Sequence, residues 1–250
     1  MSPSSPPDLV EQAKELAAHR AVDNHVTPAV RVLGVGSGST IVYAVHRLAA
    51  IRERLHPDLV CVPTSFQSRQ LLVELGFRVG DLDEFPRVDL TIDGADEVDA
   101  QLNAIKGGGA AQLREKVVAA ASDTFILIAD HRKDSTQLGQ QWTQGVPVEV
   151  VPFAYATVQR QIAAITPGSG PGLFTAPTPQ PTLRMAQRKA GPVVTDNGNF
   201  VLDVDFGRIS APQVLFERLI QLPGVVEVGL FCGMAARAYF GQADGSVRER

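Results

Sequence analysis

The sequence predicts an α/β protein, in which a doubly wound parallel sheet is followed by a smaller α+β unit. Apolar strand-like runs alternate with amphipathic helical segments in the first half of the chain. From about residue 146 the order becomes strand, helix, strand, strand, helix, strand. The chain has 250 residues, which exceeds the usual size of one compact domain. Its composition, with 44% hydrophobic and 20% charged residues, is typical of a globular protein.

The first half repeats a unit of strand, turn and helix. A strand buried on both faces is a continuous apolar run, whereas a covering helix has apolar residues three and four positions apart. Continuous apolar runs occupy residues 31–36, 59–63, 88–93 and 125–130. Helical spacing is found in residues 40–55, 66–75 and 111–121. These elements predict a parallel sheet with helices on both faces.

The second half has a different order, which predicts a ferredoxin-like sandwich. Asn197-Gly198 predicts a type I′ hairpin turn. Proline and glycine in residues 166–183 exclude a regular element there and indicate a mobile loop or an insertion. Asp244-Gly245 predicts a last hairpin, which we expect to return to the first unit. We expect strands at residues 147–153, 191–196, 199–206 and 225–231, and helices at residues 156–165 and 211–222.

Charge and targeting signals narrow the class of partner. Lys plus Arg number 23 against 27 Asp plus Glu, so a formal charge of −4 offers no basic field for nucleic acid or an anionic membrane. The longest apolar stretch, residues 117–129, is interrupted at residues 122–124 and is shorter than the ~20 residues of a membrane-spanning helix. Residues 1–12 lack the parts of a secretory signal. We therefore expect a cytoplasmic protein whose partner is a small molecule.

Cysteine and histidine give no sign of a metal site. Cys61 and Cys232 are far apart in the chain, and we expect both to be buried thiols. The five histidines show no spacing typical of metal ligands, and none is assigned a catalytic role.

Residues 34–40, GVGSGST, lie between an expected strand and an expected helix. Such a turn leaves backbone N–H groups free at a helix N-terminus, and the hydroxyls of Ser39 and Thr40 add donors that suit a phosphate dianion. The alternative is a tight turn that needs glycine only for its backbone. A dinucleotide fingerprint would need glycine where Ser39 stands. A small phosphorylated metabolite fits this turn better than a nucleotide.

Carboxylates follow the strand at residues 88–93, in the sequence DGADE. The carboxyl ends of parallel strands face the ligand crevice, so Asp93 and Asp96 would lie near the glycine turn. Their oxygens could accept hydrogen bonds from sugar hydroxyls. A solvated turn is equally compatible with the spacing.

Lys106 precedes three consecutive glycines, whose conformational entropy is costly unless the backbone closely approaches another group. Glu115 follows within two helical turns, between Arg114 and Lys116. An isolated Arg-Glu-Lys would more often be a solvated helix face. The glycine loop and the lysine beside it favour a site. At the end of the strand at residues 125–130, Lys133 could reach the same crevice or remain solvated.

Seven motifs together resemble the type A ribose-5-phosphate isomerase family, in order and from about Lys14 to Phe231. They are GVGSGST, DGADEVD, IKGGGAAQLREKVVA, IADHRK, PVEVVPF, GPVVTDNGNFVLDV and PGVVEVGLF. The resemblance implies a Rossmann-like catalytic domain of residues 1–139 and 235–250. It also implies an inserted ferredoxin-like α+β lid and oligomerisation domain of residues 140–234.

The resemblance also implies the site. Glu115 would be the catalytic base, and Lys106, Asp93 and Asp96 would assist it. Lys14 would lie near the phosphate. No metal or cofactor is implied, and the family usually forms homodimers or homotetramers. The residues implied to bind substrate are Ser37, Gly38, Ser39, Thr40, Asp93, Gly94, Ala95, Asp96, Lys106, Gly107, Gly108, Gly109 and Lys133.

The implied activity is the interconversion of ribose 5-phosphate and ribulose 5-phosphate in the pentose phosphate pathway. Two features depart from the family pattern: serine at position 37, where threonine is common, and a longer Pro-rich segment near residues 166–181. A non-catalytic sugar-phosphate sensor and a nicotinamide-dependent oxidoreductase are the alternative functions.

Overall fold

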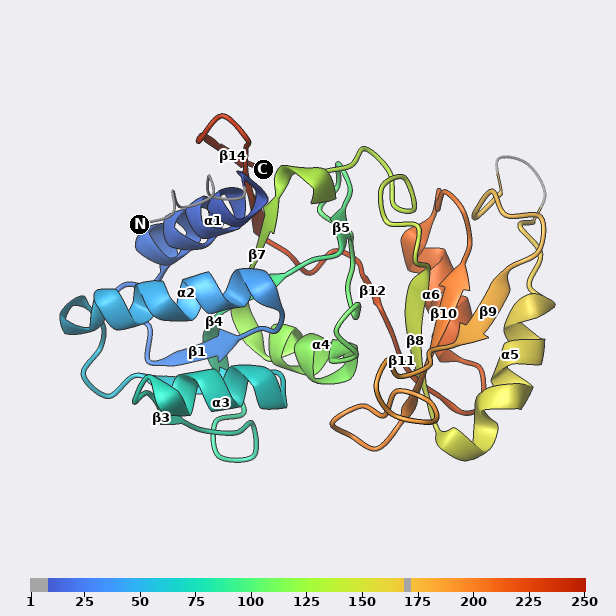
Figure 1. Cartoon of the computed structure of the whole chain (residues 1–250), viewed down its shortest axis with the longest axis horizontal. Helices are drawn as coiled ribbons and strands as arrows, with labels where there is room; N and C mark the ends of the chain where they lie inside the picture. The colour runs from blue at the N-terminus through green and yellow to red at the C-terminus, as the bar shows by residue number, and fades with distance from the viewer. Residues whose placement is uncertain (1–8, 169–171) are drawn as a thin grey trace, which may run out of the picture.

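The computed structural model describes residues 9–168 and 172–250 (Figure 1). Residues 1–8, where we expected no secretory signal, lie outside the described residues, as do residues 169–171 of the Pro-rich segment. In the described part of the chain, no helix is both long enough and apolar enough to cross a membrane.

The larger sheet has seven strands in the order β14-β13-β7-β4-β1-β2-β3, of which all but β14 run parallel. This arrangement confirms the predicted parallel sheet. The predicted last hairpin is also confirmed, because the two C-terminal strands pair with each other and the first of them, β13, pairs with β7. The strands are β1 (Val32–Val35), β2 (Val60–Pro63), β3 (Arg78–Val79), β4 (Val88–Gly94), β7 (Ser122–Asp130), β13 (Arg237–Gly241) and β14 (Val247–Glu249).

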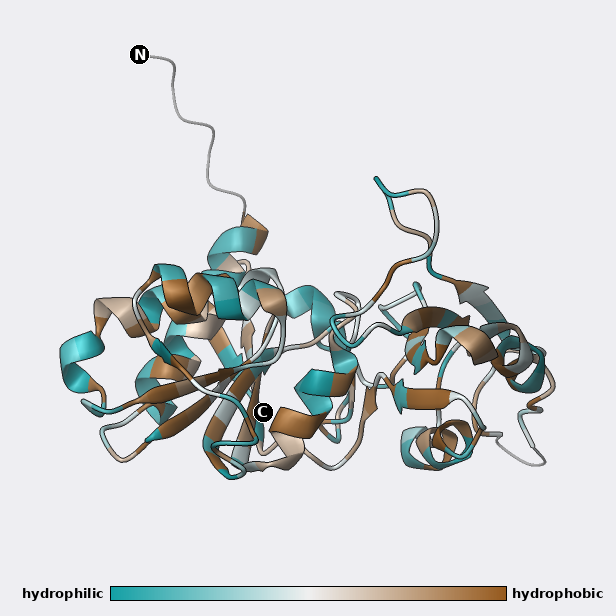
Figure 2. Ribbon diagram, turned by 90° about the horizontal axis from the view of Figure 1, so that it is seen from below, coloured by the Kyte–Doolittle hydropathy of each residue, from teal (hydrophilic) through white to brown (hydrophobic). Residues whose placement is uncertain are grey.

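Helices cover both faces of this sheet, as the alternation along β7 shows. Ile126 and Ile128 pack with residues of α1 (Leu9–His25) and α2 (Ser39–Ala50). Phe125 and Leu127 pack on the other side with residues of α4 (Gln112–Ala120). Figure 2 shows the apolar strands lying between these helices. The sheet is therefore buried on both faces, which explains its continuous apolar strands.

Two further helical elements complete this unit. The helix α3 (Phe66–Glu74) follows β2 and is capped by Ser65, whose side chain accepts a hydrogen bond from the backbone N–H of Ser68. The predicted helix over residues 40–55 is shorter than expected. It ends at Ala50 and is followed by a separate 3₁₀ turn, η1 (Arg52–Arg54).

The smaller sheet has four antiparallel strands in the order β11-β8-β10-β9. With two helices packed against it, this is the strand order of a ferredoxin-like sandwich, as predicted. Its elements are β8 (Val146–Val150), η3 (Pro152–Ala154), α5 (Tyr155–Ala163), β9 (Gln180–Leu183), β10 (Phe200–Asp205), α6 (Pro212–Ile220) and β11 (Val225–Val228).

The second strand of this unit is not where the sequence placed it. Residues 191–196 form no strand, and β9 instead lies within residues 166–183, where we expected no regular element. The reason is its position: β9 is an edge strand, and an edge tolerates Pro181 because proline lacks only an N–H that can face away from the sheet.

The turn at Asn197-Gly198 exists but is not of type I′. That type needs positive φ at both residues, and of the two only Gly198 has it, with φ of 80°. The N–H of Gly198 donates to the carbonyl of Thr195 at 2.9 Å, and the N–H of Thr195 donates to that of Asn199 at 2.9 Å. This is a three-residue hairpin loop with glycine in the left-handed position.

A small antiparallel sheet, β12-β6-β5, lies between the two larger ones (Figure 1). Its strands are β5 (Glu97–Val98), β6 (Ala104–Ile105) and β12 (Leu230–Phe231). The buried carboxylate of Glu97 accepts hydrogen bonds from the backbone N–H groups of Gly139, Gln140 and Gln141. The division into domains at residues 1–139 with 235–250 and 140–234 stays a prediction.

The two cysteines differ in burial. Cys61 is buried, as expected, in the core beneath α2 and α3. The expectation for Cys232 is wrong, because this thiol is only partly buried, on the segment that leaves β12.

Gln112, the first residue of α4, has a fully buried side chain whose Oε1 and Nε2 have no hydrogen-bond partner among the described residues. A buried amide without a partner is destabilising. We expect Gln112→Leu, which conserves size, to raise the free energy of unfolding by about 1–2 kcal/mol. Urea unfolding measures this change. The exposed Gln70→Leu is the matched control and should give no gain, whereas lower stability of Gln112→Leu would indicate a hidden partner such as an internal water.

Candidate active site

The turn between β1 and α2 forms one end of a cavity at the carboxyl edge of the larger sheet. Gly36 permits a close approach of β1 to β4, because a Cβ there would lie 1.8 Å from Oδ1 of Asp93. The helix α2 begins at Ser39 without a side-chain cap, so its first N–H groups have no partner within the helix. With the hydroxyls of Ser39 and Thr40 beside them, these amides form a site suited to an anion.

Ser37 and Gly38 also line the cavity, but their polar groups are already bonded within the protein. The Ser37 hydroxyl lies 2.8 Å from Oγ1 of Thr64, and its N–H donates to Asp93. The N–H of Gly38 donates to Oε1 of Gln67 at 2.9 Å. The turn therefore offers an anion mainly the groups at Ser39 and Thr40.

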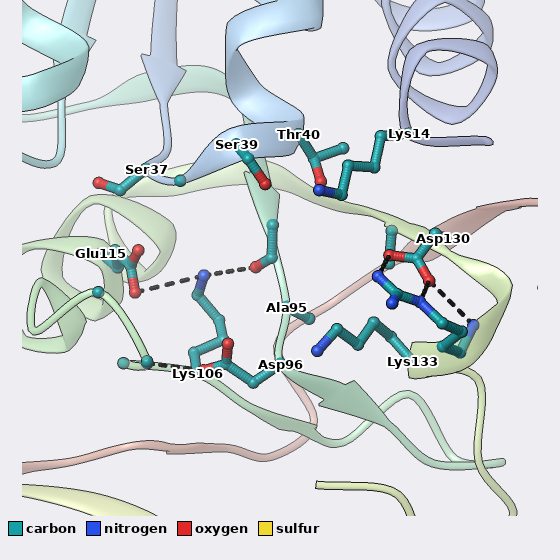
Figure 3. Close-up of a pocket in the computed structure, with 17 residues that line it drawn as sticks. Lys14, Ser37, Ser39, Thr40, Ala95, Asp96, Lys106, Glu115, Asp130 and Lys133 are labelled. Carbon is teal, nitrogen blue, oxygen red and sulfur yellow. Dashed lines mark hydrogen bonds and ion pairs between the residues drawn. The ribbon is translucent and has the colours of Figure 1, made fainter. Parts of the chain in front are cut away.

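Cationic side chains gather at the same end of the cavity (Figure 3). Lys14 of α1 and Lys133 of η2 (His131–Lys133) both line it, as the sequence predicted. The ammonium of Lys14 pairs with Glu11 at 2.6 Å. That of Lys133 lies 4.8 Å from the centre of the Trp142 ring. These two cations, one held by a carboxylate and one by an aromatic face, suit the charge of a phosphate.

Asp130 and Arg132 line the cavity as well and were missed as site residues. Nε of Arg132 lies 2.7 Å from Oδ1 of Asp130. Burial raises the pKa of Asp130, but hydrogen bonds from Arg132 outweigh it and lower the pKa overall. Their place in the ADHRK motif at the end of β7 was the available signal, since that end of a parallel strand faces the ligand.

The opposite end of the cavity contains a buried lysine between two carboxylates. Nζ of Lys106 lies 2.9 Å from Oδ2 of Asp93 and 3.3 Å from Oε2 of Glu115, and donates to the carbonyl of Gly94 at 2.5 Å. The exposed fractions of the three side chains are 2%, 0% and 6%. Figure 3 shows Glu115 on the far side of the cavity from Asp130 and Lys133. The sequence prediction that these distant segments converge is confirmed.

The triglycine loop forms the adjoining wall. Gly107 has φ of 102°, and the N–H of Gly108 donates to Oδ2 of Asp96 at 2.7 Å. A Cβ at Gly108 would lie 2.6 Å from Oδ1 of Asp96, so only glycine allows the backbone this close to the carboxylate. Gly94, Ala95, Asp96 and Gly107 to Gly109 all line the cavity.

Asp93 does not line the cavity. It is fully buried beneath the glycine turn, where Oδ1 accepts hydrogen bonds from the N–H groups of Ser37 and Gly94 at 3.0 and 2.7 Å. Its other oxygen faces Lys106. A direct contact between Asp93 and substrate stays a prediction, and the geometry favours an action through Lys106.

Burial determines the ionisation of this end of the cavity. Burial raises the pKa of Glu115, and the negative charge of Asp93 raises it further. Lys106 lowers this pKa in part, and the result is a pKa of about 8. Burial also raises the pKa of Asp96. For Lys106, burial acts to lower the pKa, but the charges of Asp93 and Glu115 reverse this and raise it overall. The site therefore combines a base that titrates near neutral pH with a permanent cation.

The cavity of about 220 Å³ is below the roughly 300–1,000 Å³ of sites for drug-sized ligands, so it suits a small metabolite. Within residues 9–168 and 172–250, no group of three or more His, Cys, Asp or Glu side chains could hold a metal ion. The arrangement can anchor a phosphate at one end and move a proton at the other.

Comparison with known proteins agrees with this geometry. The family model for ribose 5-phosphate isomerase A (phosphoriboisomerase A) matches residues 60–245. A ribose-5-phosphate isomerase of Cryptococcus neoformans var. neoformans is 52% identical over 96% of this chain and 80% of its own length. The Homo sapiens ribose-5-phosphate isomerase is 51% identical over 96% of this chain and 73% of its own.

A solved structure is similar as well. It is a D-ribose-5-phosphate isomerase in complex with phospho-erythronic acid, with a TM-score of 0.85 and 36% sequence identity, over 96% of this chain and 98% of that one. The match extends over both sheets, so the larger and the smaller unit both have counterparts in that isomerase. By sequence and by fold, the chain belongs to the ribose 5-phosphate isomerase A family.

Proposed function

We propose that the chain interconverts D-ribose 5-phosphate and D-ribulose 5-phosphate by moving a proton between C2 and C1 of the open-chain sugar, with Glu115 as the base. The observation that carries the proposal is the pairing of two ends in one small cavity. A buried carboxylate beside Lys106 lies at one end, and an anion site at Ser39 and Thr40 lies at the other.

The phosphate end supplies binding energy remote from the reaction. Amides at the start of α2, the hydroxyls of Ser39 and Thr40, and the cations of Lys14 and Lys133 would hold the dianion. A phosphate fixed there orients C1 and C2 toward the other end of the cavity, so part of the entropy of reaction is lost on binding.

Glu115 would perform both proton transfers. Its carboxylate removes the proton from C2 of the aldose, which gives a cis-enediolate. The hydroxyl proton moves from O2 to O1, and the carboxylic acid then returns the first proton to C1, which gives the ketose. A general base is most effective when its pKa lies near the working pH, and burial places the pKa of Glu115 at about 8. A solvated glutamate would be a weaker base.

Lys106 and the glycine loop would stabilise the enediolate. Negative charge develops on the oxygens at C1 and C2, and donors already in place stabilise it without reorganisation. The raised pKa of Lys106 keeps it protonated. The backbone N–H groups of Gly107 and Gly109 belong to the loop beside it and would add donors, whereas the N–H of Gly108 is bonded to Asp96.

Asp96 and Asp93 would have different supporting roles. Asp96 lines the cavity, where it can hold a sugar hydroxyl and assist the opening of the furanose ring that must precede enolisation. Asp93 holds the ammonium of Lys106 from below. Ser37 keeps the hydroxyl that threonine commonly supplies in the family, and this hydroxyl bonds to Thr64.

The alternative functions lack a supporting observation. A non-catalytic sensor would not need a buried proton-transfer group, and a nicotinamide site would need more room than about 220 Å³. A cytoplasmic location and assembly into a homodimer or homotetramer stay predictions.

Replacing the base tests the mechanism directly. Glu115→Gln keeps the size and one hydrogen-bonding oxygen but removes the basic group, so we expect kcat to fall about 10²–10⁴-fold. Formation of ribulose 5-phosphate by the purified variant is the measurement. Glu74→Gln on the exposed surface of α3 is the control. Near-normal turnover of Glu115→Gln would contradict the assignment.

The pH profile tests the raised pKa. Because Glu115 must be deprotonated in the free enzyme, we expect kcat/KM to rise about tenfold per pH unit and to level off above about 8. Asp93→Asn removes a negative charge that raises this pKa, so the rise should shift to lower pH. Asp89→Asn, at the other end of β4, is the control and should leave the rise of kcat/KM at the same pH as in the wild type. An unchanged profile in Asp93→Asn would refute the electrostatic cause.

The phosphate site can be tested with two substrates. Charge-assisted hydrogen bonds are worth about 1.5–3 kcal/mol, so Ser39→Ala and Thr40→Ala should each raise KM for ribose 5-phosphate about 10- to 100-fold. The rate with unphosphorylated ribose should not change. Ser37→Ala should have a smaller effect, because its hydroxyl already bonds to Thr64. If Ser39→Ala and Thr40→Ala weakened the reaction of ribose 5-phosphate and of ribose equally, the phosphate would bind elsewhere.

A further inference from the structure

Arg184 connects the smaller sheet to the triglycine loop. It directly follows β9, and β9 itself lies in residues 166–183, where the sequence predicted no regular element. Its Nη1 donates to the carbonyl of Gly107 at 3.0 Å and to that of Gly108 at 3.1 Å. One side chain of the second unit therefore holds two consecutive carbonyls of the loop that forms the wall of the cavity.

Asp203 of β10 fixes the guanidinium from the other side. Nε of Arg184 donates to Oδ2 of Asp203 at 2.8 Å, and Nη2 pairs with Oδ1. Exposed fractions of 16% and 22% show that both side chains are largely shielded from water. A two-bond arginine–carboxylate pair sets the plane of the guanidinium, so the direction of Nη1 is fixed before any substrate binds.

The peptide geometry connects these bonds to the catalytic end. In a planar trans peptide the C=O and the next N–H point in opposite directions. The Gly107 carbonyl accepts from Arg184, so the N–H of Gly108 points away from Arg184. That N–H donates to Asp96, which lines the cavity. By the same geometry, the Gly108 carbonyl on Arg184 turns the N–H of Gly109 toward that side. The Gly107 carbonyl is also held by the N–H of Ala110 at 2.9 Å, so the contribution of Arg184 is greatest at the Gly108 carbonyl, where glycine would otherwise allow many orientations.

We propose that Arg184 is a positioning residue for the isomerase reaction: it holds the triglycine loop so that the N–H of Gly109 faces the enediolate oxygens, while the N–H of Gly108 stays bonded to Asp96. Arg184 is not among the residues that line the cavity, so it acts through the loop and not on the substrate. Because the bonds to the loop come from the second unit, the donor wall is complete only when both units are in place. The inference rests on the proposed function.

Steady-state kinetics separate positioning from binding. Arg184→Met keeps the aliphatic stem and removes both carbonyl contacts, and a misplaced catalytic wall costs about 10- to 100-fold in rate. We expect kcat to fall by that factor and KM for ribose 5-phosphate to stay within about twofold, because the phosphate end is unchanged. Arg184→Lys keeps the charge but cannot bind Asp203 and the loop in the same way. Its kcat should therefore lie between that of the wild type and that of Arg184→Met.

The matched control is Arg87→Met. Arg87 makes the same kind of two-bond pair with Asp123, but the pair lies at the amino ends of β4 and β7, and Arg87 is 78% exposed. It should leave kcat and KM unchanged.

Two further readouts would not change if Arg184 only stabilised the fold. Phospho-erythronic acid has a carboxylate that resembles the enediolate, so its binding should weaken in parallel with kcat in Arg184→Met, while inhibition by inorganic phosphate should not change. In Arg184→Ala, millimolar guanidinium should restore part of kcat.

The outcomes are distinct. Normal kcat in Arg184→Met, or a fall in kcat matched by a large rise in KM and by weaker phosphate inhibition, overturns the proposal. If Arg184→Met does not fold, Arg184→Lys decides between the same outcomes. If the wild-type protein forms no ribulose 5-phosphate, the proposed function fails. An active wild type with unaffected Arg184 variants refutes the positioning role alone.

Discussion

The rest of the site depends on the ammonium of Lys106 between the carboxylates of Asp93 and Glu115. Three ionisable groups are buried together there, with two negative charges facing one positive charge. Without the cation, burial of both carboxylates would be prohibitive. With it, two carboxylates still share one cation, and burial together with the charge of Asp93 raises the pKa of Glu115. The same arrangement makes Glu115 a base near neutral pH and keeps a cation beside it.

This cluster constrains the surrounding backbone. Asp93 can reach Lys106 only because β1 passes β4 at Gly36, where a side chain has no room. Lys106 is held in turn at the edge of the second unit, where its N–H donates to the carbonyl of Gly229 at 2.9 Å. The residues that line the phosphate end come from the larger unit, with Trp142 of the second unit against Lys133. The reacting end is held by Gly229 and Arg184 of the second unit. The second unit thus helps to hold the backbone around Lys106 in place.

The second unit also contacts the larger unit at a distance from Lys106 and Glu115. The turn after residue 195 contacts the larger unit through both Phe66 and Arg114: Asp196 accepts from the N–H of Phe66 at 2.8 Å, and Nε of Arg114 donates to Asn197 at 2.8 Å. The fully buried Glu149 of β8 holds this turn through Thr195 and Asn199. The helix that carries Glu115 is therefore restrained at the neighbouring residue by the second unit.

Local patterns in the sequence determined the strand–turn–helix units, the ferredoxin-like order and the anion site at Ser39 and Thr40, because these depend on neighbours in the chain. The motifs also pointed to Lys106 and Glu115, which the structure brings together in one cavity. Tertiary structure decided the edge strand β9, the form of the Asn197-Gly198 turn, and the positions and contacts of Asp93, Asp130 and Arg184. The physical reason is that ionisation, donor direction and tolerance of proline depend on burial and on groups from distant segments, which spacing along one chain does not encode.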